Sequence, residues 1–160
     1  MKRVLNPNES KRLSALRELN ALETSNDDVL DLITKLTREI FDVPICLITL
    51  LDEHQQWFKS KIGTTLERAD RTTAFCDHTI RSEAVFIVED ERLDDRFKNS
   101  PLVAGPPNIR FYAGAPLITR EGFALGSLCL LADTPLPFRL RQKDMLSDLA
   151  AIVIDIIETR

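Results

Sequence analysis

Cys76, Asp77 and His78 form the one constellation in this sequence whose residue types could carry reaction chemistry. An imidazole close to a thiol can take its proton and leave a thiolate, the form that attacks electrophiles and oxidants. Cys76 and His78 are two positions apart, however, and side chains so spaced do not share a face of a helix. Two interpretations therefore stay open: a reactive thiol used in catalysis or redox sensing, or side chains that line a pocket and pack against a helix.

A second group of residues that could bind or react is acidic: Asp90, Glu91, Asp94 and Asp95. These carboxylates could attract a hard cation, but they lack the regular ligand spacing and the glycine of a calcium loop. A solvated loop is favoured. The alternative is that Arg96 and Arg110 pair with the carboxylates and hold the loops in place. Both histidines, His54 and His78, stand outside any ligand motif, so the sequence predicts no metal site.

The segment from Arg110 to Leu131 predicts two antiparallel strands that would organise the fold and position these groups. Its turn is Arg120-Glu121-Gly122, where the glycine can take the positive φ that a short hairpin connection needs. Small residues crowd the middle of both strands, so a packed helix or a ligand can approach closely.

The remaining elements are expected on both sides of this hairpin. Helices are predicted at Ser10–Leu22, Val29–Ile40 and Arg139–Thr159, and strands at Ile45–Leu51, Gln56–Ile62 and Ala84–Val88. In the second helix the apolar face would be Val29, Ile33, Leu36 and Ile40, after capping residues in Thr24-Ser25-Asn26. A short helix is expected at 75–80, one helical turn at 94–99, and irregular chain at 63–74 and 101–107. This order indicates an α+β fold with one antiparallel sheet.

Composition narrows the class of protein. A chain of 160 residues with 44% hydrophobic residues suits one domain with a substantial core. The net charge of -4 argues against nucleic-acid binding, which normally needs a basic surface. Three cysteines without CxxC spacing indicate a reducing compartment, hence the cytoplasm. We expect no signal peptide and no membrane contact, because the N-terminus has no apolar core and the longest apolar run is short.

Taken together and in order, several short motifs resemble those of a GAF domain, a small sensory module related in shape to PAS domains. The resemblance begins at about Arg12 and is to the group found beside bacterial histidine kinases and diguanylate cyclases. It implies a central antiparallel sheet of five to six strands, with the terminal helices on one face and the short helix and loops roofing a pocket on the other. The motifs are Val43-Pro44-Ile45, Gln56-Trp57-Phe58-Lys59-Ser60, Phe75-Cys76-Asp77-His78-Thr79-Ile80, Asp95-Arg96-Phe97, Asn99-Ser100-Pro101-Leu102-Val103, Ile109–Leu117 and Leu125–Cys129.

The resemblance also implies a function: a single domain over 1–160, with a core of about 12–157, that serves as a non-catalytic sensory or regulatory module of bacterial signal transduction. Its small-molecule ligand and any cofactor are unknown. An output domain such as a histidine kinase or diguanylate cyclase would be its partner. The predicted ligand-binding residues are Trp57, Cys76, His78, Ile80, Phe97, Arg110 and Tyr112.

The sequence departs from two ligand-binding groups of the family. Leu131-Ala132-Asp133 stands where cyclic-nucleotide binders carry Asn-Lys, and Asp77 separates Cys76 from His78 where bilin binders join cysteine to histidine. Two alternatives remain: an enzyme like free methionine-(R)-sulfoxide reductase that works through cysteine, and a ligand-free dimerisation scaffold. Trp57 and Tyr112 are equally open between walls of a ligand site and core residues with one polar tip.

The C-terminal helix, 139–159, is expected to signal or dimerise. A heptad-like seam runs through Leu146, Leu149, Val153 and Ile156, with flanking stripes at Met145 and Ile152 and at Ile154 and Ile157. This apolar arc is wider than one contact surface needs, so we predict a homodimer through the terminal helices. The alternative is that one chain covers the whole arc.

Overall fold

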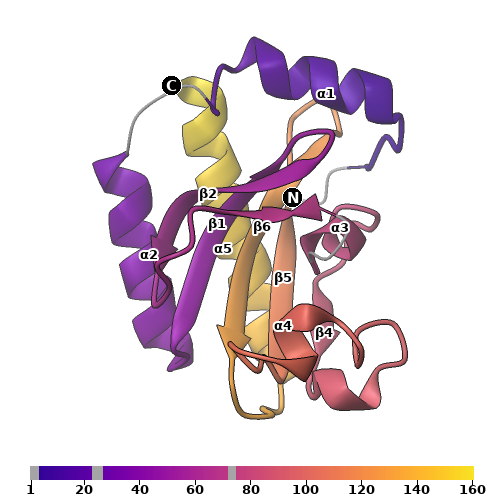
Figure 1. Cartoon of the computed structure of the whole chain (residues 1–160). Helices are drawn as coiled ribbons and strands as arrows, with labels where there is room; N and C mark the ends of the chain where they lie inside the picture. Colours follow the sequence, from indigo (N-terminus) through magenta and orange to yellow (C-terminus); the bar gives the residue numbers. More distant parts are fainter. Residues whose placement is uncertain (1–3, 23–26, 72–74) are drawn as a thin grey trace.

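The computed structural model describes residues 4–22, 27–71 and 75–160. Its centre is a six-stranded antiparallel sheet in the order β3-β2-β1-β6-β5-β4 (Figure 1). The α+β fold with a sheet of five to six strands is therefore confirmed. The strands are β1 (Ile45–Leu51), β2 (Gln55–Ile62), β3 (Arg68–Asp70), β4 (Phe86–Val88), β5 (Phe111–Ile118) and β6 (Ala124–Ala132).

Helices cover both faces of this sheet, and the long ones lie together. α2 and α5 pack on one face, while the short helices and the loops around them lie over the other (Figure 1). The helices are α1 (Glu9–Glu18), α2 (Asp28–Phe41), α3 (Cys76–Thr79), η2 (Glu91–Leu93), α4 (Pro101–Ala104) and α5 (Leu140–Thr159). Among the described residues, no helix has the length and apolarity that crossing a membrane requires.

The predicted hairpin is the β5–β6 pair at the middle of the sheet. Its register places Tyr112 opposite Leu131 and Gly114 opposite Cys129, and β6 continues into β1 with Cys129 opposite Leu47. Gly122 has a φ of 97°, as the turn prediction requires. Every residue of β6 is buried, because helices cover one face of the strand and the pocket-side loops cover the other.

Alternation along the strands separates two cores. On the helix side, the core takes Leu128 and Leu130 from β6 together with α5. On the opposite side, a second core takes Cys129 and Leu131 from the same strand, together with α3 and Phe97. Because neighbouring residues of a strand point to opposite faces, one apolar run supplies both cores.

The predicted apolar face of α2 is wrong at three of its four residues: Ile33 is partly buried against the core, whereas Val29, Leu36 and Ile40 are exposed. Its buried residues are Leu30, Thr34, Thr37 and Phe41. Both threonines can be buried because their hydroxyls donate to backbone carbonyls four residues earlier, and the Thr34 hydroxyl also lies 2.8 Å from that of Ser60. Threonines with satisfied hydroxyls thus take buried positions, and most of the face that periodicity assigned to the core lies on the surface. The exposed stripe is Val29, Leu32, Leu36 and Ile40.

The seam predicted on α5 lies largely inside the chain. Leu146 and Val153 are fully buried against the sheet, and Leu149 and Ile156 are partly buried beside them. Ile154 and Ile157 are buried too, so the large exposed apolar residues in this part of the helix are Met145 and Ile152. The sheet takes the central seam because α5 packs along β5 and β6 for most of its length.

Smaller differences lie in connecting segments. The region expected to be irregular contains β3, which pairs with β2 from Gln55 to Trp57. The loop expected at 101–107 begins with α4, whose first turn is capped by the Ser100 hydroxyl. The helical turn expected at 94–99 is preceded by η2. The predicted caps at 24–26 lie outside the described residues, and Asp27 caps α2 by accepting from Val29 and Leu30.

Candidate functional site

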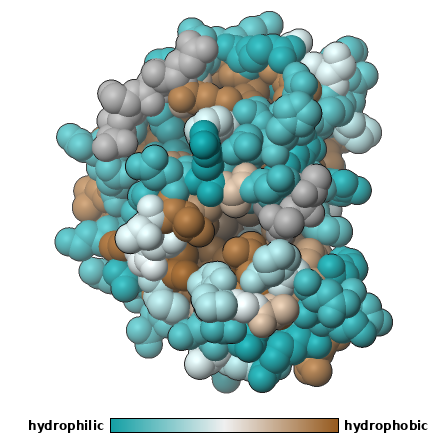
Figure 2. Space-filling view, viewed as in Figure 1, coloured by the Kyte–Doolittle hydropathy of each residue, from teal (hydrophilic) through white to brown (hydrophobic). Residues whose placement is uncertain are grey.

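A pocket opens on the sheet face opposite α2 and α5. It encloses about 540 Å³ including its open mouth. Figure 2 shows this face hollowed near its middle, with hydrophobic side chains inside and hydrophilic ones around. Its apolar walls include Ile45, Leu47, Phe58, Leu66, Phe75, Leu102, Ile109 and Leu131, and its polar members include Gln56, Cys76 and Tyr112.

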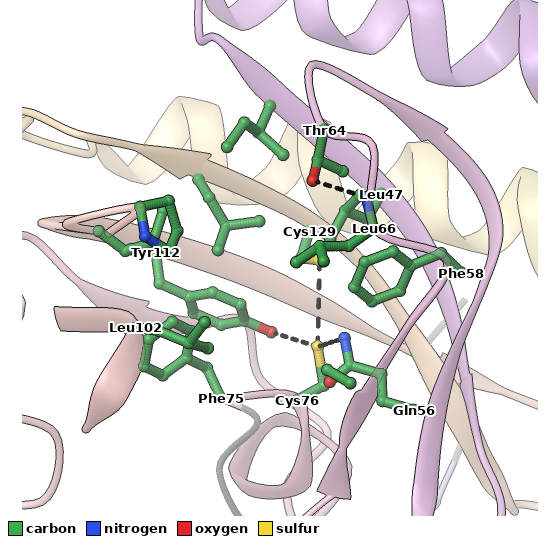
Figure 3. Close-up of a pocket in the computed structure, with 15 residues that line it drawn as sticks. Leu47, Gln56, Phe58, Thr64, Leu66, Phe75, Cys76, Leu102, Tyr112 and Cys129 are labelled. Atoms are coloured by element: carbon green, nitrogen blue, oxygen red, sulfur yellow. Dashed lines mark hydrogen bonds between the residues drawn. The ribbon is translucent and has the colours of Figure 1, made fainter. Parts of the chain in front are cut away.

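The Cys76 sulfur is the point in the pocket where the side chains of Gln56, Tyr112 and Cys129 meet (Figure 3). The Ser127 hydroxyl donates to it at 3.0 Å and the Gln56 amide at 3.3 Å. The Tyr112 hydroxyl lies 3.1 Å away, and the Cys129 sulfur 4.0 Å away. We call these five residues the thiol cluster. They come from α3, β2, β5 and β6, so the sheet and its short helix assemble the cluster jointly.

Local sequence explains how Tyr112 reaches this point. Gly114 lies two residues along β5 on the same face, and a Cβ at that position would overlap the Tyr112 hydroxyl. The absence of that carbon lets the phenol ring lie along the strand toward α3. There the hydroxyl also contacts Thr79 at 2.7 Å. Gly114 thus has a specific structural reason to lack a side chain.

The cluster changes the acidity of its members. Burial opposes ionisation of Cys76, but hydrogen bonding with Cys129, Ser127, Tyr112 and Thr49 outweighs it and holds the pKa of the thiol below its ordinary value. Burial, with the neighbouring Cys76, raises the pKa of Cys129 and of Tyr112. Cys76 is therefore the more acidic thiol of the pair, and Cys129 the less acidic one.

Two of the seven predicted ligand-binding residues line this pocket, namely Cys76 and Tyr112. Trp57 points elsewhere: its indole N–H donates to Asp52 at 2.7 Å, and Arg68 lies over its ring. Because Gln56 and Phe58 line the pocket, the residue between them faces the other side of β2.

The other four predicted residues also lie outside the pocket lining. Ile80 and Phe97 are buried in the pocket-side core. Arg110 donates to the backbone carbonyl of Val103 at 2.7 Å. The His78 ring packs against Phe86 and Phe97, with ring centroids 5.8 and 4.9 Å away. The structure does not bring these four to Cys76.

His78 is therefore not the base that the sequence pattern suggested for Cys76. Burial lowers the pKa of His78, and the charges of Arg96 and Arg81 lower it further. The residues that do surround the thiol, namely Gln56, Ser127 and Cys129, were missed by sequence reasoning. A usable signal existed, because Ser127 and Cys129 are two apart in one strand and so share a face. Only the register of β6 shows which face that is.

The acidic segment 90–95 is organised by arginines. Asp94 and Arg96 form the predicted kind of pair at 2.7 Å, and Asp90 pairs with Arg92 at 2.9 Å. Glu91 is different: it is fully buried, and neither carboxylate oxygen has a hydrogen-bond partner. Burial raises its pKa to about 8, with help from the charge of Asp94. Across the described ranges, no group of three or more His, Cys, Asp or Glu side chains could hold a metal ion.

An ion-pair network joins α1 to α3 beside the pocket. Arg71 donates to Glu9 at 2.6 Å and to Asp77 at 2.8 Å. Arg12 is buried, contacts the same Glu9 at 2.9 Å and donates to the Leu51 carbonyl at 2.8 Å. Hydrogen bonding to Arg12 lowers the pKa of Glu9 to about 2, against the effect of burial. The N-terminal helix is thus tied to the helix that carries Cys76.

Comparison with known proteins identifies the family to which this architecture belongs. The model of the GAF domain family matches residues 25–154. The chain is 41% identical over 152 residues to a Pseudomonas aeruginosa protein named cyclic di-GMP phosphodiesterase PA2567. That match covers 94% of this chain but 26% of the relative, so the chain spans about a quarter of the relative's length.

Solved structures agree at the level of the fold. The GAF domain of an Acinetobacter phosphoenolpyruvate-protein phosphotransferase has a TM-score of 0.69 at 18% identity, covering 93% of this chain and 94% of that one. Free methionine-R-sulfoxide reductase from Neisseria meningitidis, solved with its substrate, has a TM-score of 0.67 at 16% identity, covering 99% and 96%. At such identities the likeness establishes a shared fold alone.

Proposed function

The chain belongs to the GAF domain family, and we propose that it is a non-catalytic sensory module that binds a small molecule in the pocket and passes the change to an output domain. The observation that carries this proposal is the pocket itself, an open apolar hollow with a polar group of side chains inside it. Apolar walls with a few convergent polar groups are the usual construction of a small-molecule site.

The chemistry of the pocket suggests the kind of ligand. Its walls are mainly leucine, isoleucine and phenylalanine side chains, and the hydrogen-bonding groups of Gln56 and Tyr112 meet at Cys76. No charged side chain is among the described residues that line it. The proposed ligand is therefore an uncharged, mainly apolar molecule with a hydrogen-bonding group at one end. Of the seven predicted contacts, this assignment uses Cys76 and Tyr112.

The output is proposed from the relative. A protein named cyclic di-GMP phosphodiesterase contains a segment like this whole chain within a quarter of its length. We propose that this module likewise regulates an output domain of cyclic di-GMP signalling, in a cytoplasmic protein. The expected histidine kinase or diguanylate cyclase remains a prediction, as does the single domain over 1–160 with its core of 12–157.

A homodimer is also proposed, through a surface that differs from the predicted seam. The α2–α5 stripe comprises six exposed apolar residues: Val29, Leu32, Leu36, Ile40, Met145 and Ile152. The two helices contact each other, and Arg160 at the end of α5 pairs with Asp27 at the start of α2 at 2.8 Å. Apolar side chains arranged along two neighbouring helices suit burial against a second copy.

Ligand binding can be tested by thermal shift against a panel of uncharged metabolites, because a ligand that prefers the native state raises the melting temperature. A saturable rise should occur in the wild type and disappear in Leu102→Trp, which fills the pocket. The matched control is Leu93→Trp, at an exposed position outside the pocket. A rise that persists in Leu102→Trp would place the ligand elsewhere. No saturable rise would favour the ligand-free scaffold.

The dimer can be tested by light scattering at tens of micromolar. Leu36→Glu or Ile152→Glu should convert a dimer into a monomer, because each adds a charge to the α2–α5 stripe. Leu93→Glu, at a leucine that is more exposed than either test position and lies away from the stripe, should leave the dimer intact. A wild-type monomer would remove the proposed interface.

One observation favours the enzyme alternative: two buried thiols lie 4.0 Å apart beside the pocket. Turnover of free methionine-(R)-sulfoxide with thioredoxin, abolished by Cys76→Ser, would support it. Absence of turnover would leave the sensory module.

A further inference from the structure

The two thiols of the pocket are arranged differently from the third cysteine. The sulfurs of Cys76 and Cys129 are 4.0 Å apart, and both residues line the pocket. Cys46 is buried on the helix side of the sheet. All three are free thiols in the structure. Two buried thiols thus line one open pocket, and the third lies across the sheet from them.

The surroundings of Cys76 stabilise a negative charge on its sulfur. Ser127 and Gln56 donate to it, and the Tyr112 hydroxyl can do so while it accepts from Thr79. The titratable groups in contact are Tyr112 and Cys129, both of which remain protonated because burial raises their pKa. These donors lower the pKa of Cys76 despite its burial, whereas burial raises the pKa of Cys46 to about 12. The thiolate is the reactive form of cysteine, so reactivity should concentrate at Cys76.

We propose that Cys76 and Cys129 form a peroxide-reactive dithiol site, in which a hydroperoxide enters the pocket, oxidises Cys76 and drives formation of a Cys76–Cys129 disulfide. In the first step the Cys76 sulfur attacks the peroxide oxygen. An S–O bond forms, the O–O bond breaks, and the departing hydroxide or alkoxide takes a proton and leaves as water or an alcohol. Cys76 is then a sulfenic acid.

In the second step the Cys129 sulfur attacks the Cys76 sulfur. The S–S bond forms, the S–O bond breaks, and the hydroxide leaves as water with the proton of Cys129. The two thiols together lose two electrons, and the peroxide gains them. A dithiol reductant reverses the change.

The disulfide would alter the domain beyond the two sulfurs. A disulfide needs the sulfurs about 2.05 Å apart, so they must approach by about half of their present separation. Cys76 would then leave Ser127 and Tyr112, and α3 would be drawn toward β6. Since Asp77 of α3 is bound through Arg71 to Glu9 of α1, the movement would reach the N-terminal helix. This site goes beyond the proposed ligand binding and does not depend on it.

The test treats the reduced 160-residue chain with a small excess of hydrogen peroxide and maps the products by mass spectrometry. We expect a Cys76–Cys129 disulfide, reversed by dithiothreitol, with Cys76 oxidised at least about tenfold faster than Cys46 because more of it is thiolate. Cys46→Ser is the matched control and should oxidise like the wild type. Cys129→Ser should give a Cys76 sulfenic acid, trapped by a cyclic diketone.

Folding of each variant is checked by circular dichroism, and the product map of the wild type stands even if Cys129→Ser does not fold. The proposal would be overturned by equal oxidation of Cys46 and Cys76, by a disulfide that involves Cys46 or links two chains, or by thiols that survive a large excess of peroxide. Thermal-shift binding in the unoxidised protein is a separate readout, so failure here is distinguishable from failure of the ligand proposal.

Discussion

The two faces of the central sheet are built from the same strands but differ in chemistry. On the helix side, Leu128 and Leu130 of β6 pack against α5 in a continuous apolar core. On the pocket side, Ser127 and Cys129 of the same strand meet Tyr112, Gln56 and Cys76 beside an open hollow. Alternate residues of β6 therefore have different roles: Leu128 and Leu130 stabilise the core, and Ser127 and Cys129 contribute to the thiol cluster.

The three cysteines make the difference plain. Cys46 and Cys129 are both fully buried in central strands, yet only the latter has a second thiol beside it. Burial by itself raises the pKa of a thiol, as at Cys46. Hydrogen bonds to its sulfur lower the pKa of Cys76. Reactivity in this fold is thus set by the partners that a face supplies and not by depth.

The largest expected effect tests the helix-side core against the pocket side. Leu128→Ala should lower the free energy of unfolding by about 3–5 kcal/mol, because it leaves a closed cavity between the sheet and α5. Leu131→Ala removes the same atoms from the same strand but borders the pocket, so it should cost less, about 1–3 kcal/mol. Denaturant unfolding measures both. Equal costs would mean that the pocket side is as tightly packed as the helix side.

The next effect concerns Glu91, the buried carboxyl without hydrogen-bond partners. Its pKa is about 8 in the folded chain and about 4.5 unfolded, so between these values the folded state holds a proton that the unfolded state has lost. Stability should therefore fall as pH rises, by up to about 1.4 kcal/mol per pH unit.

Glu91→Gln removes this dependence. It should match the wild type near pH 4.5 and exceed it increasingly toward pH 8, as measured by urea unfolding across that range. Asp95→Asn, at an exposed carboxylate in the same segment, is the control and should change little. A constant difference between Glu91→Gln and the wild type would show that the carboxyl is ionised throughout.

A smaller effect is expected from Tyr112→Phe, which removes the hydroxyl between Cys76 and Thr79. We expect a loss of about 1 kcal/mol in stability, typical of one buried hydrogen-bonding group. The pKa of Cys76 should rise, because one donor to its sulfur is gone. The pH dependence of alkylation by a small thiol reagent measures this. Thr79→Val, which leaves the phenol in place, should raise the pKa less.

The smallest effect lies in the network that joins α1 to the pocket side. Glu9 is about half exposed, so Glu9→Gln should cost under about 1 kcal/mol at neutral pH. The pKa of Glu9 is lowered to about 2, so its contribution is present above about pH 4.5 and disappears as the pH falls through 2. Denaturant unfolding should give a lower free energy of unfolding for Glu9→Gln than for the wild type at pH 7, and nearly equal values at pH 2. A difference that persists at pH 2 would contradict the ion-pair role.

Sequence patterns determined much of this fold. Ile45–Leu51 is β1 as predicted, and Gln56–Ile62 and the β5–β6 hairpin are correct to within a residue or two. The long final helix and the turn at Gly122 are also where the pattern placed them. These elements have strong local causes: unbroken apolar runs, a glycine with positive φ, and prolines before the helix.

The site and the helix faces were decided by tertiary structure. Periodicity chose Val29, Leu36 and Ile40 for the buried face of α2, but these are exposed, and threonines take buried positions because Ser60 and backbone carbonyls satisfy them. Sequence proximity joined Cys76 to His78, whereas the fold joins Cys76 to residues of β2, β5 and β6. Cys129 lies 53 positions away in sequence and 4.0 Å away in space. Local patterns record which residues alternate along a strand, but strand register alone determines which of them meet across the sheet.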